Sequence, residues 1–182
     1  MGALLIALAG FASAWAYRRE ERMQFALLYY LWGLLWWCGN GINEIARYVP
    51  SPSVADALLA FAALTGWLAA EVHRKRPASA LALTTLAGFV VALPLALAQM
   101  DAHQQPFAGY GIWAWLAFAL LGIRSLLCLR TSEDRYAGWA QFAWWLVWPT
   151  VVSLLFSWLA DRFELAQGWQ VALLSLPWLA AI

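Results

Sequence analysis

The sequence predicts an all-α polytopic bundle of transmembrane helices with six to seven spans. Of the 182 residues, 64% are hydrophobic and only 12% are charged, whereas soluble domains are usually about half apolar and about a quarter charged. The apolar residues form long segments that are separated by short charged or proline-containing loops. A bilayer can cover this apolar surplus, which a soluble domain of this length would have to expose.

Seven apolar segments are expected to be helical spans, since a crossing needs about 20 residues. They cover residues 2–17, 23–48, 54–72, 78–98, 112–129, 139–159 and 170–182. The charged run 18–22 ends the first segment, and Pro50 ends the second because proline cannot continue a helix. Ser53 with Asp56 three residues on predicts a capping box at the start of the third segment.

The later segments contain internal prolines and small-residue rows. Pro94 and Pro149 are expected to kink the fourth and sixth segments. Small residues at a spacing of four predict a close hairpin between the third and fourth segments, namely Ala62, Gly66 and Ala70 with Ala80, Thr84, Gly88, Ala92 and Ala96. The 13 residues of the last segment make about 20 Å of helix against about 30 Å of hydrocarbon, so we expect a piece of a longer polytopic protein.

Basic residues are distributed unevenly between the two sides of the predicted bundle. Loops 18–22, 73–77 and 130–138 carry eight Lys and Arg residues, and the opposite side has only Arg47 and Arg162. Lys and Arg are enriched in the cytoplasmic loops of membrane proteins. We therefore expect these three loops to be cytoplasmic in a multi-pass membrane protein.

The second segment carries the leading candidate for a polar site. Asn40, Glu44 and Arg47 share one helix face, with Asn43 beside them. Charged residues within a membrane usually face a bundle interior or a cavity. One interpretation is an outward-facing site in which Glu44 is an acid, a base or a proton carrier and Arg47 either pairs with it or binds an anion. The other is an interfacial salt bridge at a polar helix end, because Glu44 lies about 20 residues along its span.

Asp56 and Arg124 are lower-ranked candidates. The capping box explains Asp56 without a function, and Arg124 either extends toward the inner headgroups or pairs with Glu71, the first being favoured. Asp101 and His103 are expected in a solvated loop over residues 99–111. Two such residues do not make a metal site, so the sequence predicts no metal and no cofactor.

Other residue types exclude further classes of site. The net charge of +1, without a basic stripe, excludes a nucleic-acid partner. Cys38 and Cys128 are expected at different depths, beyond the reach of a disulfide. Five tryptophans are expected in the packed core rather than at the interface: Trp36, Trp37, Trp144, Trp145 and Trp148.

Three blocks of the chain resemble a known family. They are Leu31-Trp32-Gly33-Leu34-Leu35-Trp36-Trp37 with Glu44-Ile45 and Pro50, Pro106-Phe107-Ala108-Gly109-Tyr110-Gly111 with Trp113-Ala114-Trp115, and Trp169 with residues 173–177. Together they resemble the large bacterial membrane proteins of domain of unknown function 2339. The resemblance implies an inner-membrane protein with more than seven helices, and it implies no activity and no catalytic residue.

Three classes of function follow from these observations. The first is a non-enzymatic cell-envelope membrane module, with membrane lipids and the remaining transmembrane helices of a parent chain as partners. The alternative is a transporter or lipid-handling protein that uses the polar site around Glu44. An intramembrane enzyme is third, because only Asp56 or Asp101 with His103 offers a second acid or base.

Overall fold

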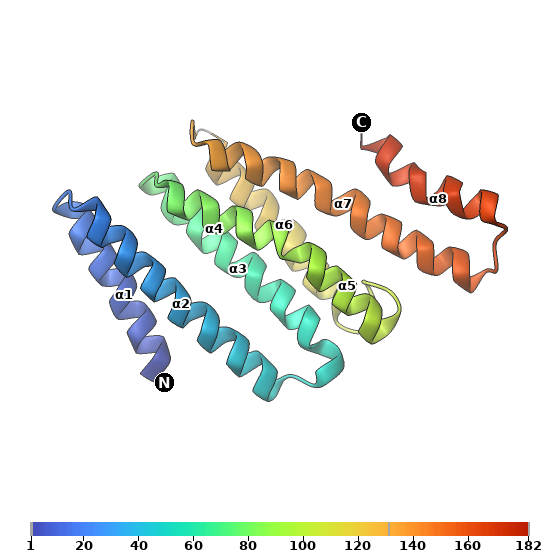
Figure 1. Cartoon of the computed structure of the whole chain (residues 1–182), viewed down its shortest axis with the longest axis horizontal. Coiled ribbons are helices and arrows are strands. Elements are labelled where there is room, and N and C mark those ends of the chain that lie inside the picture. The colour runs from blue at the N-terminus through green and yellow to red at the C-terminus, as the bar shows by residue number, and fades with distance from the viewer. Residues whose placement is uncertain (1, 131, 182) are drawn as a thin grey trace. The chain divides into compact units, whose positions relative to one another are not determined.

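The structure is a computed structural model that describes residues 2–130 and 132–181. The chain is 86% helical, without strands among the described residues, which confirms the predicted all-α helical bundle. Figure 1 shows the elements in chain order: α1 (Gly2–Arg19), α2 (Met23–Tyr48), a 3₁₀ turn η1 (Ser51–Ser53), α3 (Val54–Lys75), α4 (Ser79–Val90), α5 (Ala92–His103), α6 (Gly111–Leu129), α7 (Arg135–Arg162) and α8 (Gln167–Ala180).

Within residues 2–130 and 132–181, four helical stretches are long and apolar enough to cross a membrane. They are Ser51–Lys75, Ser79–His103, Gly111–Leu129 and Arg135–Arg162. The chain therefore has the helix lengths and composition of a membrane protein. The helices α1, α2 and α8 are not among these four stretches, so membrane spans there stay predictions. Helix α8, with its 14 residues, is only about 21 Å long.

The chain divides into two compact units, Met1–Pro50 and Ser51–Ile182. The first unit is the hairpin of α1 and α2, whose backbones meet at two glycines. A Cβ added to Gly10 would lie 2.8 Å from the Cα of Gly33. Only glycine permits this approach, and the stacked rings of Tyr17 and Tyr29 add a contact nearer the turn, with centroids 5.2 Å apart.

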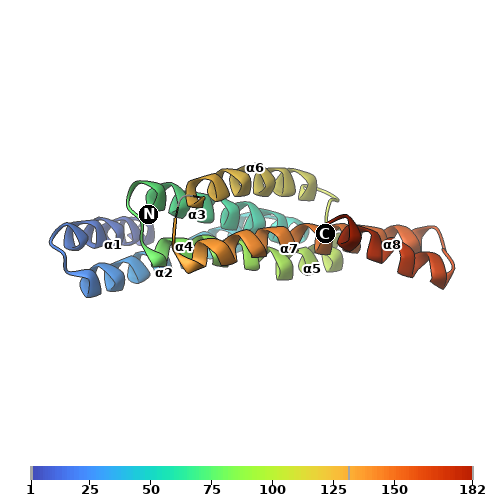
Figure 2. The same ribbon diagram turned by 90° about the horizontal axis from the view of Figure 1, so that it is seen from above.

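The second unit is organised by α3. This helix packs against α4 and α6, while α7 packs against α4 and α5 (Figures 1 and 2). A Cβ added to Gly88 would lie 3.1 Å from the carbonyl oxygen of Ala62, and the Thr85 hydroxyl donates to the carbonyl of Gly66 at 3.0 Å. These contacts confirm the close hairpin predicted from the small-residue rows.

The two internal prolines have different effects on their helices. The predicted fourth segment is interrupted at Val91, which separates α4 from α5. The interruption lies in the turn before Pro94, whose missing N–H cannot bond to the carbonyl of Val90. By contrast, α7 continues as one helix through Pro149.

Aromatic side chains fill the middle of the second unit. Phe118 stacks on Trp144 with ring centroids 5.1 Å apart, and it meets Trp115 edge-on at 5.3 Å. Trp144 and Trp148 therefore belong to the core, as predicted. Trp145 does not: it is 40% exposed because the next position along α7 faces away, and its Nε1 donates to the carbonyl of Ala181.

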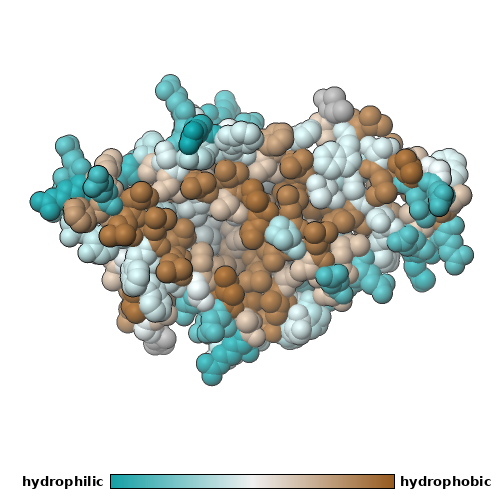
Figure 3. Space-filling model, in the orientation of Figure 1, coloured by the Kyte–Doolittle hydropathy of each residue, from teal (hydrophilic) through white to brown (hydrophobic). Residues whose placement is uncertain are grey.

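Apolar side chains also cover much of the outer surface. Figure 3 shows hydrophobic residues along the helices and hydrophilic residues over the connecting loops. On α6, Ile112, Trp113, Leu120 and Leu127 are each more than half exposed. Soluble monomers rarely expose contiguous apolar patches of this kind, so this surface agrees with a bilayer as its surroundings.

Gly122 provides a test of the aromatic packing. A Cβ added there would lie 2.0 Å from the Trp144 ring, which Phe118 holds in place. Overpacking costs roughly 1–3 kcal/mol, so Gly122→Ala is expected to lower the free energy of unfolding by that amount. In the control Gly138→Ala, the added Cβ meets no atom within 4 Å, and helix propensity favours alanine by up to about 1 kcal/mol.

Thermal unfolding in mild detergent compares the two variants. The reporter is reaction of the buried Cys128 thiol with a fluorescent maleimide in a Cys38→Ala background. Equal melting temperatures for the two glycine variants would contradict the packing described here.

Candidate functional site

The polar residues predicted on the second segment lie in the last turns of α2. Asn40 is partly buried, whereas Asn43, Glu44 and Arg47 are exposed. The guanidinium of Arg47 lies over the ring of Tyr48, 5.4 Å from its centroid. Within the described part of the first unit, Glu44 forms no ion pair with Arg47. The predicted residues therefore lie together at the end of α2, but Glu44 and Arg47 do not form a salt bridge with each other.

Asp56 is not a capping residue. Ser53 occupies the N-cap position of α3, yet its side chain makes no capping hydrogen bond. The preceding 3₁₀ turn leaves Ser53 at φ −100° and ψ 5°, outside the extended conformation that a capping side chain requires. Asp56 instead points into the bundle, where it is 3% exposed.

Asp56 belongs to a buried network that joins three helices. Its Oδ1 accepts from Nε2 of Gln99 on α5 at 2.6 Å, and Oε1 of Gln99 accepts from Nε1 of Trp115 on α6 at 2.9 Å. Gln99 is fully buried and Trp115 is 2% exposed. Each polar atom in this chain of bonds therefore depends on a neighbour on another helix, since water does not reach it.

His103 faces the second oxygen of Asp56. Its Nε2 lies 3.9 Å from Oδ2, and both atoms are buried without a hydrogen-bond partner in the described chain. The prediction of a solvated loop over residues 99–111 is wrong for Gln99 and His103, because α5 continues to His103 and Gln104 follows as its C-cap with φ 65°. Their spacing of four residues, which puts both side chains on one helix face, is the sequence signal for this arrangement.

A tight turn covers the network. Gly109 has φ +56°, and a Cβ there would lie 3.4 Å from the His103 ring. A Cβ on Gly111 would clash with the carbonyl oxygen of Pro106. Both positions therefore require glycine, and the loop closes this end of the second unit over His103 and Asp56.

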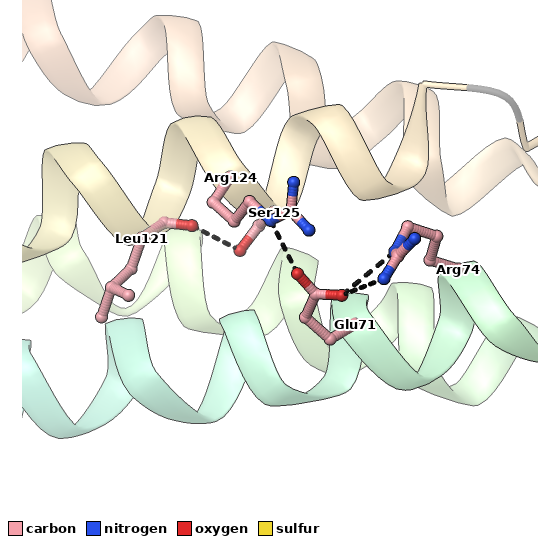
Figure 4. Close-up of polar contacts among 5 residues, drawn as sticks. All are labelled: Glu71, Arg74, Leu121, Arg124 and Ser125. Carbon is pink, nitrogen blue, oxygen red and sulfur yellow. Dashed lines mark hydrogen bonds and ion pairs between the residues drawn. The ribbon is translucent and has the colours of Figure 1, made fainter.

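The opposite end of the second unit carries a cluster of three charged residues. Oε1 of Glu71 on α3 accepts from Nε of Arg124 on α6 at 2.7 Å, and its Oε2 lies 3.0 Å from Nη2 of Arg74 (Figure 4). This differs from the favoured prediction, in which Arg124 extends toward the inner headgroups without pairing with Glu71. The structure shows the pairing instead, because α3 and α6 pack side by side and bring the two side chains within reach.

Two further contacts tie the basic loops of the second unit together. Nδ1 of His73 lies 3.0 Å from the carbonyl oxygen and 3.2 Å from the amide nitrogen of Ala78, and Nε2 of the same ring lies 2.9 Å from Oγ of Ser132. The Ser79 hydroxyl donates to Asp134, which also caps α7 by accepting from the amide of Tyr136. Loops 73–77 and 130–138 of the prediction therefore lie at the same end.

Asp134 lies outside the candidate spans, and its surroundings shift its titration. Partial burial raises the pKa of this carboxyl, but hydrogen bonds from the Ser79 hydroxyl and the Tyr136 amide outweigh burial and hold the pKa below its ordinary value. The ionised form is therefore favoured by the fold, because it is the form that accepts both bonds.

The two cysteines and the other residue types that bind metals are the remaining candidates within the described chain. Cys38 and Cys128 are free thiols, one in each unit. Across residues 2–130 and 132–181, no group of three or more His, Cys, Asp or Glu side chains is placed to hold a metal ion.

No family model, curated protein or solved structure matches this chain. The resemblance to domain of unknown function 2339 therefore stays a prediction.

Gln99 offers a test of the buried network. Gln99→Leu leaves Oδ1 of Asp56 and Nε1 of Trp115 without partners, at about 1–3 kcal/mol for each buried group. We expect a loss of roughly 2–6 kcal/mol of unfolding free energy, measured by the thiol-reactivity assay in detergent. The control Gln141→Leu makes the same change on an exposed face of α7. A Gln99 variant as stable as that control would contradict the network.

Asp134 offers a test that depends on pH. Asp134→Ala removes the cap of α7 and is expected to cost about 1 kcal/mol near neutral pH. A lowered folded pKa contributes stability above the unfolded carboxyl pKa, about 3.9, and loses it as the pH falls through the folded value. The difference from the native chain should therefore shrink below about pH 4. The control Glu133→Ala removes an exposed neighbouring carboxylate, and an equal pH dependence in that variant would contradict the assignment.

Proposed function

We propose that this chain is a non-enzymatic structural module of the bacterial inner membrane, with loops 18–22, 73–77 and 130–138 in the cytoplasm. Its partners in this proposal are membrane lipids and further transmembrane helices of a parent protein. The four long apolar helices and their exposed hydrophobic surface support the membrane location. The basic residues that cluster at one end of the second unit support the orientation.

The aromatic core of the second unit is the observation that supports a structural module over a transporter. A transport path through the second unit needs polar lining near its middle, but Phe89, Trp115, Phe118 and Trp144 occupy that region with ring centroids 5.1–5.8 Å apart. Close-packed interiors of this kind resist deformation. The polar groups lie instead toward the two ends, where they bond helices to one another.

Cysteine labelling tests the orientation. In a background with Cys38→Ala and Cys128→Ala, Ser51→Cys and Glu133→Cys place single exposed thiols near opposite ends of the second unit. A membrane-impermeant maleimide added to spheroplasts should label residue 51 directly and residue 133 only after permeabilisation. The reverse pattern would overturn the orientation, and equal labelling of both would overturn the membrane crossing.

Reconstitution distinguishes a structural module from a transporter. Proteoliposomes should show no proton or organic-anion flux above protein-free liposomes, with or without a membrane potential, and Glu44→Gln should leave this unchanged. Spin labels at the two introduced cysteines should give one distance distribution that the potential does not alter. A flux that Glu44→Gln abolishes would overturn the proposal in favour of the transporter or lipid-handling alternative around Glu44.

A further inference from the structure

The cluster of Glu71, Arg74 and Arg124 at the basic end of the second unit contains two positive side chains and one negative side chain. Glu71 is the only anion of the cluster, and both of its oxygens are occupied by Arg74 and Arg124. Arg124 contacts Glu71 through its Nε alone, and its two terminal nitrogens have no hydrogen-bond partner within the described residues. The cluster therefore keeps a net charge of about +1 and a set of free donors.

The exposure of the three side chains places the positive charge outward. The side chains of Arg74 and Arg124 are 48% and 49% exposed, whereas that of Glu71 is 20% exposed. Figure 4 shows the three side chains converging between α3 and α6. The carboxylate is thus covered by the two guanidinium groups, and an approaching ligand meets cations first.

The depth of Arg124 separates this cluster from the basic loops. Arg124 lies six residues before Arg130, which is about 9 Å along the helix axis. Both Arg124 and Glu71 are inside helices that qualify as membrane spans. An uncompensated charge inside a span is costly unless the side chain reaches water, a headgroup or another anion.

The surface around the cluster suits an acyl chain. On α6, Leu120, Ile123 and Leu127 are 61%, 51% and 54% exposed, and Leu120 and Leu127 lie four before and three after Arg124 on the same face. On α3, Leu68 and Val72 flank Glu71 and are 41% and 40% exposed. A cationic head site thus adjoins an apolar strip that runs toward the middle of the bilayer.

We propose that Glu71, Arg74 and Arg124 form a binding site for the phosphate of an anionic phospholipid. The two terminal nitrogens of Arg124 match the paired oxygens of a phosphodiester. Glu71 holds Nε of Arg124, so the donors are oriented before the lipid arrives. The net charge selects a headgroup of charge −1 over a zwitterionic one. This site goes beyond the proposed structural role, because a membrane protein of any activity can contain it.

Native mass spectrometry of the full chain in mild detergent tests the site. The protein is titrated with dioleoyl phosphatidylglycerol or with dioleoyl phosphatidylcholine, and the fraction carrying one bound lipid is measured. Phosphatidylglycerol should bind more tightly, and Arg124→Gln should weaken it by about tenfold, the effect of losing a charge-assisted bidentate contact. The control Arg130→Gln removes the same charge at the exposed end of α6 and should leave the affinity within about twofold.

Two additional arms keep the test decisive. Arg124→Lys keeps a positive charge beside Glu71 but lacks the planar guanidinium group that can bind two phosphate oxygens at once. It should therefore still weaken lipid binding several-fold, while the thiol-reactivity assay shows a folded protein. Equal weakening by Arg124→Gln and Arg130→Gln, or equal affinity for the two lipids, would overturn the site. Displacement of the lipid by millimolar inorganic phosphate would assign the site to a soluble anion and overturn the lipid assignment.

Discussion

The close approach of α3 to α4 at Gly66 and Gly88 is the contact on which the second unit depends. Membrane helices associate through packing and interhelical hydrogen bonds rather than through the hydrophobic effect. A side chain at Gly88 would press on the carbonyl of Ala62, and the bond from Thr85 to the carbonyl of Gly66 would then lengthen. Since α3 also packs along α6, its distance from α4 decides where the polar groups at both ends meet their partners.

The two ends of the second unit solve different electrostatic problems. At one end a single carboxylate, Asp56, is almost completely buried, where it accepts a hydrogen bond from Gln99 and lies 3.9 Å from Nε2 of His103. At the other end Glu71 is paired with two arginines that remain half exposed. Burial of one charge requires a covered, internally bonded site, whereas a cluster with surplus positive charge is stable only where anions or water reach it. The ends therefore differ in access as well as in charge.

The sequence predicts the helices of this chain more reliably than the direction of their polar side chains. Long apolar runs and proline boundaries define the helices, and the small-residue rows identify the hairpin of α3 and α4. The spacing of Ser53 and Asp56 satisfies a capping box equally well when Asp56 faces inward. Likewise, the polar residues from Gln99 to His103 read as a loop, although two of them share an inward helix face. Helix rotation is set by tertiary packing, which a single sequence does not encode locally.

Two glutamates of this chain show how far local spacing determines a polar site. Glu44 and Glu71 each precede an arginine by three residues, Arg47 and Arg74, a spacing that permits an ion pair on any helix. Only Glu71 pairs with its arginine, and it does so beside a third charged group that α6 supplies. In the first unit the guanidinium of Arg47 lies over the ring of Tyr48 instead. An isolated exposed pair gains little over hydration, whereas a carboxylate held between two guanidinium groups has both oxygens fixed. The contribution of Arg124 from α6, rather than the spacing within α3, therefore fixes Glu71 in a cluster.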